Sequence, residues 1–339
     1  MAIRLKDIAR DLGISTVTVS KVLRGNKDIS DKTRARVLKR MRELNYKPNM
    51  LARGLASGRT FTVGLVVPDL VHPFFAEFAK SLAGTLREAQ MALLLASSED
   101  SAELEQQEIR TLLGRNVDVL LIASCQAQLR SFYELGDERT PFLLVDRNFP
   151  YLSAHFVGSD DYAIGCMAAE HLISIGRRRI AHIGGRAMSP SLERLRGYRD
   201  TLRRYQLETP QERIVTRERV EELGDEAGYN AMQELLKLRG RPDAVFCYND
   251  LTAIGAIEAV RTAGLTVPGD VAVVGAGNLR YARYLRVPLT SVDQQPEVLG
   301  LRAGELALQI MATPHLPSKS VVLPPRLVVR QSSVGDAAG

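Results

Sequence analysis

Residues 5–23 read LKDIARDLGISTVTVSKVL, and this stretch determines the first part of the fold. The apolar residues from Leu5 to Leu12 recur at i, i+3, i+4 and i+7, which is one face of a helix, and Gly13 interrupts the pattern. Ser15 is the expected N-cap of a second helix. Two short helices joined by a tight turn that contains glycine predict a helix-turn-helix.

The outward face of the second helix suits DNA. We expect it to turn Val19, Val22 and Leu23 inward. Its outward residues are Thr16, Val17, Ser20 and Lys21. Hydroxyl groups bond base edges or phosphates, and an apolar Val17 can contact a thymine methyl group in the major groove. The alternative is an ordinary three-helix bundle, which gives no reason for an exposed valine.

A third helix supports the first two. Ser30 is its expected N-cap, and Pro48 prevents its continuation. We expect this helix to carry the apolar residues Val37, Leu38, Met41 and Leu44.

The charge is divided unevenly along the chain. Residues 1–60 hold 15 lysines and arginines against 5 acidic residues, whereas the remainder holds 30 against 34, so an overall net charge of +6 hides a basic head. Such asymmetry is typical of a nucleic-acid or anionic membrane partner, and the alternative is a solvated charged tail. The helical pattern within the head favours nucleic acid.

The segment 49–57, which reads NMLARGLAS, follows the head and has a helical composition. It contains Gly54 and spans only about two turns, and isolated helices of that length are marginal in water. We predict that it is disordered without DNA and folds on binding, with Leu55 as an apolar wedge in the minor groove. The alternative is a plain flexible linker.

The composition excludes several protein classes. The chain has 339 residues, 45% of them hydrophobic and 25% charged, which rules out wholesale disorder. No apolar run approaches a membrane span, and the first residues lack the apolar core of a secretory signal. The three cysteines are Cys125, Cys166 and Cys247, too few and too scattered for a disulfide framework or zinc cluster, so we expect a cytoplasmic protein.

From residue 61 the pattern alternates between buried strands and helices. The expected strands are Phe61–Val67, Met91–Ala96, Val117–Ala123, Phe142–Val145, Ile180–Ile183, Ala244–Cys247 and Val271–Val274. The clearest helical stretches are Phe74–Gln90, Asp161–Ile175 and Leu251–Ala263. Alternation of this kind predicts α/β architecture with doubly wound parallel sheets, and its length predicts two lobes.

Polar side chains gather where these strands end, the edge at which open parallel sheets bind ligands. The residues at these strand ends are Asp69, Asp146, Arg147, Asp160, Arg186, Asn249, Asp250, Gly277, Asn278 and Gln294. Phe74 and Phe75 follow the first strand and offer apolar faces to a sugar. Structural alternatives exist for Asp250 and Asp160 as helix N-caps, the favoured interpretation for Asp250, and for Phe75 as a core residue.

Residues 5–60 resemble, without gaps, the DNA-binding head and hinge of the lactose-repressor/galactose-repressor (LacI/GalR) family. The resemblance covers about residues 3–330. It continues through VGLVVPDLVHPFF, VGSDDYAIG, AAEHLISIGRRRIAHIGG, AVFCYNDLTAIGAI and LTSVDQQ. It implies a dimeric transcription factor, acting as a repressor, whose body has the two-lobed periplasmic-binding-protein architecture. A corepressor-dependent regulator is the alternative.

The resemblance implies that Thr16, Val17 and Lys21 read bases and that Leu55 enters the centre of a palindromic operator. Lys21 stands where relatives often have Arg or His, so it keeps a donor but loses the bidentate fork. The full set of candidate DNA contacts is Leu5, Ser15, Thr16, Val17, Thr18, Ser20, Lys21, Ser30, Thr33, Tyr46, Asn49, Ala52, Arg53 and Leu55.

The resemblance also assigns contacts with a carbohydrate-like effector to Asp146, Arg194, Asn249 and Gln294. Together with the strand-end residues, the candidate effector site is Asp69, Phe74, Phe75, Asp146, Arg147, Arg194, Asn249, Gly277 and Gln294. Gly277 stands where relatives usually have an Asp. Without that carboxylate, and with Arg147, Arg186 and Arg194 nearby, we hypothesise an acidic or phosphorylated effector.

The expected domains are a helix-turn-helix head at 1–47, a hinge at 48–59, an effector-binding and dimerisation domain at 60–330, and a tail at 331–339. The first lobe takes about 60–160 and 293–320, and the second about 161–292 and 321–330. The tail has no heptad pattern, so we expect a dimer rather than a tetramer.

The sequence has no motif of an enzyme. HExxH, GxSxG, GxxxxGK[ST] and a strand-associated GxGxxG are all missing, and the five histidines lack metal-ligand spacing. We therefore expect no catalytic residue, cofactor, metal or membrane partner. Two other classes fit the sequence less well. A transport binding protein leaves the basic head unexplained, and an architectural DNA-binding protein leaves the polar cleft unexplained.

Overall fold

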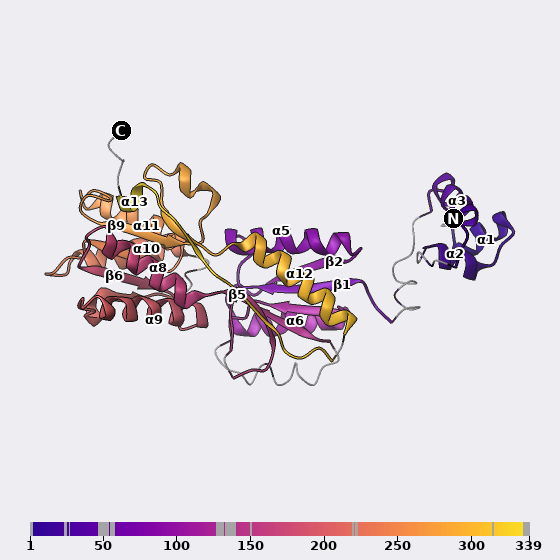
Figure 1. Ribbon diagram of the computed structural model, residues 1–339, viewed down its shortest axis with the longest axis horizontal. Coiled ribbons are helices and arrows are strands. Elements are labelled where there is room, and N and C mark those ends of the chain that lie inside the picture. Colours follow the sequence, from indigo (N-terminus) through magenta and orange to yellow (C-terminus); the bar gives the residue numbers. More distant parts are fainter. Residues whose placement is uncertain are drawn as a thin grey trace. The chain divides into compact units, whose positions relative to one another are not determined.

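The computed structural model describes most of the chain as two compact units, residues 1–60 and 61–339 (Figure 1). The described residues are 3–23, 26, 28–46, 54, 58–126, 132, 140–149, 151–218, 220, 223–313 and 315–334. Among them, none of the helices has the length and apolarity needed to cross a membrane.

In the described residues of the first unit three long helices are present, α1 (Leu5–Leu12), α2 (Thr16–Leu23) and α3 (Asp31–Glu43). Helix α1 ends at Gly13, whose φ of 65° lies in the left-handed region that glycine adopts at little cost. Ser15 Oγ accepts a hydrogen bond from the Thr18 amide at 3.0 Å, as expected of an N-cap of α2.

The three helices share a small apolar core, to which each contributes two buried side chains. These residues are Ile8, Ala9, Val19, Val22, Val37 and Met41. Of the apolar residues expected on α3, Leu38 is 42% exposed, and α3 covers the core with the neighbouring Val37. An ion pair of 2.6 Å between Arg40 and Asp11 ties α3 to α1.

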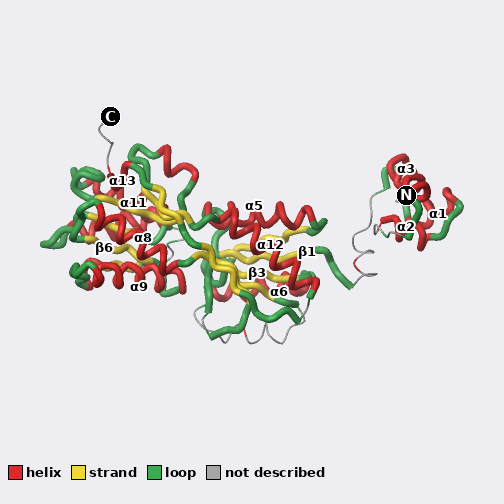
Figure 2. Tube along the Cα trace, in the orientation of Figure 1, coloured by secondary structure: helices red, strands yellow, loops and turns green. Residues whose placement is uncertain are grey.

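The second unit contains two six-stranded sheets, one in each lobe (Figure 2). The first sheet has the order β11-β5-β4-β3-β1-β2 and is parallel throughout. Its strands are β1 (Thr62–Val67), β2 (Ala92–Ser97), β3 (Val119–Ile122), β4 (Phe142–Val145), β5 (His155–Ser159) and β11 (Ser320–Leu323). Where the structure describes this lobe, its helices include α5 (Pro73–Glu88), α6 (Ala102–Gly114) and α12 (Pro296–Ala312).

The second sheet has the order β12-β10-β9-β8-β6-β7, and only β12 is antiparallel to its neighbour. Its strands are β6 (Ile180–Gly184), β7 (Ile214–Thr216), β8 (Ala244–Cys247), β9 (Ala272–Ala276), β10 (Thr290–Asp293) and β12 (Arg326–Val328). The helices are α8 (Asp161–Ser174), α9 (Ser189–Arg204), α10 (Gly224–Leu236), α11 (Asp250–Thr262) and α13 (Gln331–Val334), with 3-10 turns at Gln211–Arg213 and Arg280–Tyr284.

Alternating side chains of each strand pack on opposite faces of the sheet, which is why helices cover both faces. Leu65 of β1 packs in the core formed with α5 and α12, whereas its neighbour Val66 packs in the core formed with α6. In the second lobe, Ile180 and Ala181 divide in the same way between the α8–α9 face and the α10–α11 face.

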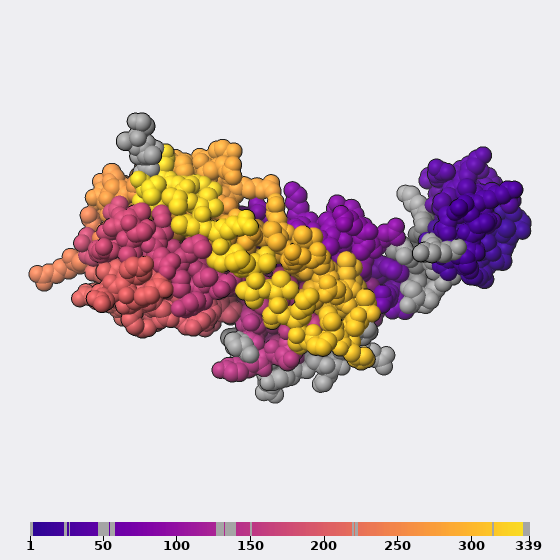
Figure 3. Space-filling view, viewed as in Figure 1, coloured from indigo at the N-terminus to yellow at the C-terminus, as the bar shows by residue number. Residues whose placement is uncertain are grey.

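Three chain segments cross between the lobes, and hydrogen bonds join them to one another. The Asp160 amide donates to Leu323 O at 3.0 Å, Ser159 Oγ donates to Gln294 O at 3.1 Å, and Gln295 Nε2 donates to Pro324 O at 2.7 Å. Figure 3 shows the last crossing segment, in yellow, running over the surface from one lobe to the other.

The expected lobe boundary at 320/321 is wrong by a few residues. Strand β11 pairs with β5 in the first sheet through Leu323, so the chain enters the second lobe only after Pro324 and Pro325. The start of the expected tail is also wrong. Residues 331–334 form α13, and Ser332 is fully buried because its hydroxyl donates to Val273 O and accepts from the Thr290 amide.

Candidate functional site

The outward face of α2 presents the side chains that were expected to meet DNA. Thr16 and Val17 are exposed, and the 59% exposure of Val17 is high for an apolar residue in a small domain. Ser20 and Lys21 are half-buried, and the Lys21 ammonium pairs with Asp28. The helix therefore carries a mixed apolar and polar surface, as base readout in a major groove requires.

Four hydroxyl residues of the candidate DNA site are engaged in helix capping. Ser15 and Thr18 share a 2.9 Å hydrogen bond at the start of α2, and Ser30 donates to Thr33 Oγ1 at 3.0 Å at the start of α3. These pairs fix the two helix N-termini, where backbone N–H groups are available to phosphate.

Leu5 and Tyr46 are half-buried and pack against the core of the head. The remaining candidate DNA contacts, Asn49, Ala52, Arg53 and Leu55, lie outside the described residues, as does the predicted folding of the hinge.

In the body, one pocket between the lobes brings together six of the nine expected effector residues. Its lining is His72, Phe74, Phe75, Asp146, Arg194, Tyr248, Asn249 and Gln294. The first four belong to the first lobe, the next three to the second, and Gln294 lies on a crossing segment. A ligand here touches both lobes at once.

Asp146 holds an unusual backbone conformation at the end of β4. The φ of Asp146 is 61°. The residues on either side of it are joined by a hydrogen bond of 2.6 Å from the Arg147 amide to Val145 O, which closes a γ-turn. A turn with positive φ is strained for a residue with a side chain, and such strain clusters at functional sites. Here the turn places the carboxyl group of Asp146 at the pocket.

Arg194 is buried on α9, where its Nε lies 2.9 Å from Asp161 Oδ1 and its Nη1 donates to Tyr248 O at 2.6 Å. Burial raises the pKa of Asp161, and the Arg194 guanidinium opposes that rise. Helices α8 and α9 approach closely at Gly165 and Gly197, where any Cβ would collide with the backbone of the other helix. These glycines let Arg194 reach its carboxylate.

The favoured interpretation of Asp250 as a helix N-cap is wrong. Asn249 caps α11, because its extended backbone lets Oδ1 accept the Thr252 amide at 2.9 Å. The carboxylate of Asp250 instead accepts from the Leu279 amide at 2.8 Å and from Ser291 Oγ at 2.6 Å. Burial raises the pKa of Asp250 to about 6. By contrast, Asp160 caps α8 as the structural alternative predicted, accepting the Ala163 amide at 2.9 Å.

The premise that Arg147, Arg186 and Arg194 share the effector pocket is wrong for Arg147 and Arg186. Arg147 and Arg186 both pair with Asp100, at 3.3 Å and 3.6 Å, in a separate small pocket, while Arg194 pairs with Asp161. Arg186 also pairs with Glu218 at 3.7 Å, so three carboxylates distant in the sequence face the three cations. The structure gives no support for an anionic effector on this ground.

Two other expected effector residues lie outside the inter-lobe pocket. Asp69 accepts the Val71 amide at 2.8 Å in a local turn. Gly277 has a φ of 131°, and a Cβ there would lie 3.6 Å from Asp250 Oδ2, so the loop serves to enclose that carboxylate.

Sequence reasoning missed two residues of the pocket, His72 and Tyr248. His72 precedes Pro73, which begins α5, and His72 Nε2 lies 3.5 Å from Asn249 Nδ2 of the other lobe. Tyr248 follows β8 directly, and its ring lies 4.8 Å from the Arg194 guanidinium carbon. The strand-end rule that selected Asn249 applies equally to Tyr248 and could have found it.

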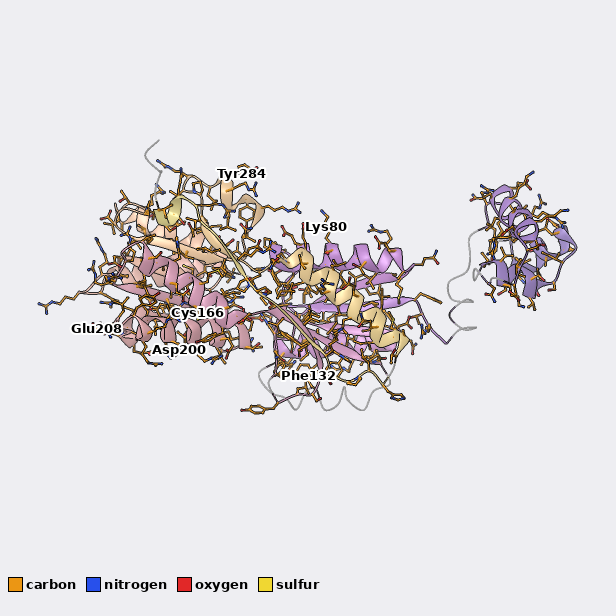
Figure 4. The ribbon with its side chains drawn as sticks, in the orientation of Figure 1. Lys80, Phe132, Cys166, Asp200, Glu208 and Tyr284 are labelled. Atoms are coloured by element: carbon orange, nitrogen blue, oxygen red, sulfur yellow. The ribbon has the colours of Figure 1, made fainter. Side chains whose placement is uncertain are left out.

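The three cysteines carry no disulfide, and Cys166 lies on α8 (Figure 4). Within the described part of the chain, His, Cys, Asp and Glu side chains form no group that could hold a metal ion.

Comparisons with known proteins match both units. Residues 4–49 match the family described as "Bacterial regulatory proteins, lacI family", and residues 169–333 match a "Periplasmic binding protein-like domain". The ribose operon repressor of Haemophilus influenzae is 34% identical over 329 residues, covering 97% of this chain and 98% of the relative.

Solved structures show the same architecture. A complex of the transcriptional regulator CelR with cellobiose has a TM-score of 0.73 and 30% identity, covering 98% of this chain and all of the other. The lac repressor dimer bound to operator and an anti-inducer has a TM-score of 0.85, covers 99% of this chain and all of the other, and at 24% identity shows the fold alone.

Proposed function

Since the chain belongs to the lacI family of bacterial regulatory proteins, we propose that it is a transcriptional repressor that binds a palindromic operator as a homodimer. One observation carries this proposal: a three-helix head with an exposed Val17 precedes a pocket lined from two lobes. One head reads a short half-site, so two heads related by a dimer axis read a palindrome. Such a protein acts in the cytoplasm, where the chromosome is.

We propose a neutral, carbohydrate-like effector for the inter-lobe pocket. The pocket offers the carboxylate of Asp146, the amide of Gln294 and the guanidinium of Arg194, which together accept from and donate to hydroxyl groups. The apolar faces of Phe74 and Phe75 suit a sugar ring. The solved CelR relative was determined with a sugar, cellobiose.

Effector binding and DNA binding are coupled thermodynamically through the angle between the two lobes. A ligand that touches both lobes stabilises one angle between them, and it shifts the population of lobe angles by its differential affinity. In a dimer the lobe angle sets the spacing of the two segments 48–59 that lead to the heads. The operator and the effector therefore alter each other's affinity by the same factor.

Selection of bound sequences from a random DNA library, at two salt concentrations, tests DNA binding. We expect a palindrome whose affinity falls steeply as salt rises, because phosphate contacts release counterions. The variant Val17→Glu is the control, since it places a negative charge on an exposed position and should abolish enrichment without unfolding the head. Absence of enrichment by the unchanged protein would contradict the proposal. Light scattering checks for a mass of twice 37.4 kDa.

A further inference from the structure

The side chain of Arg186 reaches from the second lobe to the first. Arg186 lies between β6 and α9, and its Nη2 donates to Cys125 O at 2.9 Å while its Nη1 donates to Asp100 O at 3.3 Å. The same Nη1 lies 3.6 Å from a carboxylate oxygen of Asp100. Because Asp100 comes after β2 and Cys125 after β3, one guanidinium contacts two strand ends of the opposite lobe. These three interactions are called the Arg186 contact below.

The acceptors in the first lobe are positioned by their own lobe. The buried carboxylate of Glu105, on α6, accepts from Ser124 Oγ at 2.7 Å and from the Cys125 amide. The Asp100 amide donates to Pro68 O at 3.0 Å. Because all of these groups belong to the first lobe, the position of the two carbonyl oxygens does not depend on the second lobe.

The backbone that carries Asp100 is strained. Glu99 and Asp100 are consecutive residues with positive φ, at 49° and 53°, a region that costs free energy for a residue with a side chain. This turn presents both the carbonyl oxygen and the carboxylate of Asp100 to Arg186. Backbone strain clusters at functional sites and switch regions, and here it lies at a contact between the lobes.

Both charged groups of the Arg186 contact have a second partner in their own lobe. Asp100 pairs with Arg147 of the first lobe at 3.3 Å, and Arg186 pairs with Glu218 of the second lobe at 3.7 Å. Separation of the lobes therefore leaves neither charge unpaired, which is the costly result when most buried ion pairs are broken. The Arg186 contact can thus break and form again without a large penalty.

A second arginine joins the lobes at the surface. Arg280 of the second lobe pairs with Glu77 of α5 at 3.1 Å and with Glu297 of α12 at 2.7 Å. The side chain of Arg280 is 65% exposed, whereas that of Arg186 is 26% exposed and that of Asp100 only 6%. Since water and salt screen exposed ion pairs, the Arg186 contact contributes more to holding the lobes together.

We propose that the Arg186 contact controls the angle between the lobes. When the contact is formed, the lobes have the angle seen here, and turning them apart breaks it. A ligand that favours another angle must break the contact, so residue 186 sets how readily the lobe angle changes. This inference goes beyond the proposed function, because it concerns the body alone and holds whatever the effector and the operator are.

Hydrogen exchange of one backbone amide reports whether the lobes are apart. The Asn148 amide of the first lobe donates to Ser189 Oγ of the second at 2.8 Å, so its exchange requires the lobes to separate. The Thr290 amide is the internal reference, since it donates at 2.8 Å to the buried Ser332 hydroxyl within the second lobe. Separation of the lobes exposes the first amide and leaves the second protected.

The test is hydrogen-exchange mass spectrometry on the full chain, with Arg186→Ala compared with the unchanged protein. We expect exchange at Asn148 to become about fivefold to tenfold faster, because hydrogen bonds to a charged group are lost from the closed arrangement. Exchange at Thr290 should stay the same. Unchanged exchange at Asn148 would overturn the inference.

Arg217→Ala is the matched control. Arg217 lies in the same lobe, its side chain is 27% exposed, and it pairs with Glu234 of that lobe at 2.6 Å. The substitution thus removes the same charge at the same depth without touching the first lobe. We expect exchange at Asn148 to remain as in the unchanged protein, and an increase equal to that of Arg186→Ala would overturn the inference.

A second variant covers the case in which Arg186→Ala loosens its own lobe, which faster exchange at Thr290 would reveal. Arg186→Lys keeps the charge but replaces the planar fork, so it cannot donate to both carbonyl oxygens in the same geometry. We expect faster exchange at Asn148 with Thr290 unchanged, and unchanged exchange at both amides would overturn the inference. The measurement uses neither DNA nor effector, so its outcome is independent of whether the protein selects a palindrome.

Discussion

The ammonium nitrogen of Lys21 lies 2.6 Å from a carboxylate oxygen of Asp28, across the loop that joins α2 to α3. The hydrogen bond from Lys21 lowers the pKa of Asp28, so the pair stays ionised at neutral pH. The contact fixes the direction of a side chain expected to read bases. It also places a negative charge beside a candidate DNA-contacting residue, at a position that sequence reasoning did not select.

The substitution Asp28→Asn is expected to raise affinity for DNA of any sequence severalfold and to weaken base preference at one position of each half-site. The reason is that Lys21 keeps its charge but loses the partner that orients it, and a negative charge near the phosphates disappears. Sequence selection with both proteins measures the two effects. Asp31→Asn, which makes the same charge change in the first turn of α3 without contacting Lys21, should alter general affinity only.

The substitution Val17→Ala should reduce affinity for the selected operator severalfold and leave binding to random DNA unchanged. An exposed apolar residue contributes to readout by contact with a base and contributes little to the head's core, so the free energy of unfolding should change by less than about 0.5 kcal/mol. Titration of both DNAs, together with thermal unfolding, checks this. An equal loss on both DNAs would assign Val17 a role in general binding instead.

Arg194→Ala should lower the free energy of unfolding by about 3–5 kcal/mol, because it leaves the carboxylate of Asp161 buried without its cation. Urea unfolding measures the change. Arg196→Ala provides the matched control two residues along the same helix, since Arg196 forms its ion pair with Glu193 at the surface and should matter little to stability. Equal losses in the free energy of unfolding for the two variants would contradict the predicted difference between the buried and the surface ion pair.

Two buried groups should give opposing pH dependences between pH 4 and 6. Burial raises the pKa of Asp250 to about 6, so the folded state binds the extra proton and stability falls as pH rises through this range. Burial lowers the pKa of His182 to about 4, so the unfolded state binds the extra proton and stability rises with pH. The two contributions therefore oppose each other in this range.

The substitution Asp250→Asn removes one of these contributions and so reveals the other. Relative to the unchanged protein, the variant should gain about 3 kcal/mol in free energy of unfolding between pH 4 and pH 7, because a tenfold change in proton affinity corresponds to about 1.4 kcal/mol. Chemical unfolding at pH 4, 5, 6 and 7 provides the measurement. A constant difference between the two proteins across this range would show that Asp250 has an ordinary pKa when folded.

Local patterns predicted most of the fold because their causes are local. Capping by Ser15 and Ser30, the glycine stop of α1 and the long buried strands all depend on neighbouring residues. Short strands such as β7 and β12 were not predicted, because a strand of three residues shows too little alternation between apolar and polar side chains. Helix α13 was not predicted, because the serines that it buries look in the sequence like part of a polar tail.

The candidate site was predicted less completely because the ion-pair partners of its charged side chains lie far away in the sequence. The strand-end rule found Asp146, Asn249 and Gln294, which the pocket does bring together. It could not show that Arg147 meets Asp100, 47 positions away, because ion pairing depends on how the loops fold over the sheet. The hypothesis of an acidic effector failed in its premise for that reason.

Pro324 and Pro325 form the whole of the third connection between β11 and β12, and two consecutive prolines favour an extended, semi-rigid backbone. The distance that this connection spans between the two strands is therefore nearly fixed. Separating the lobes would stretch the hydrogen bonds that join the three connections, whereas turning one lobe about them would not. We therefore infer that one lobe turns about these connections and that an effector selects one angle of that turn.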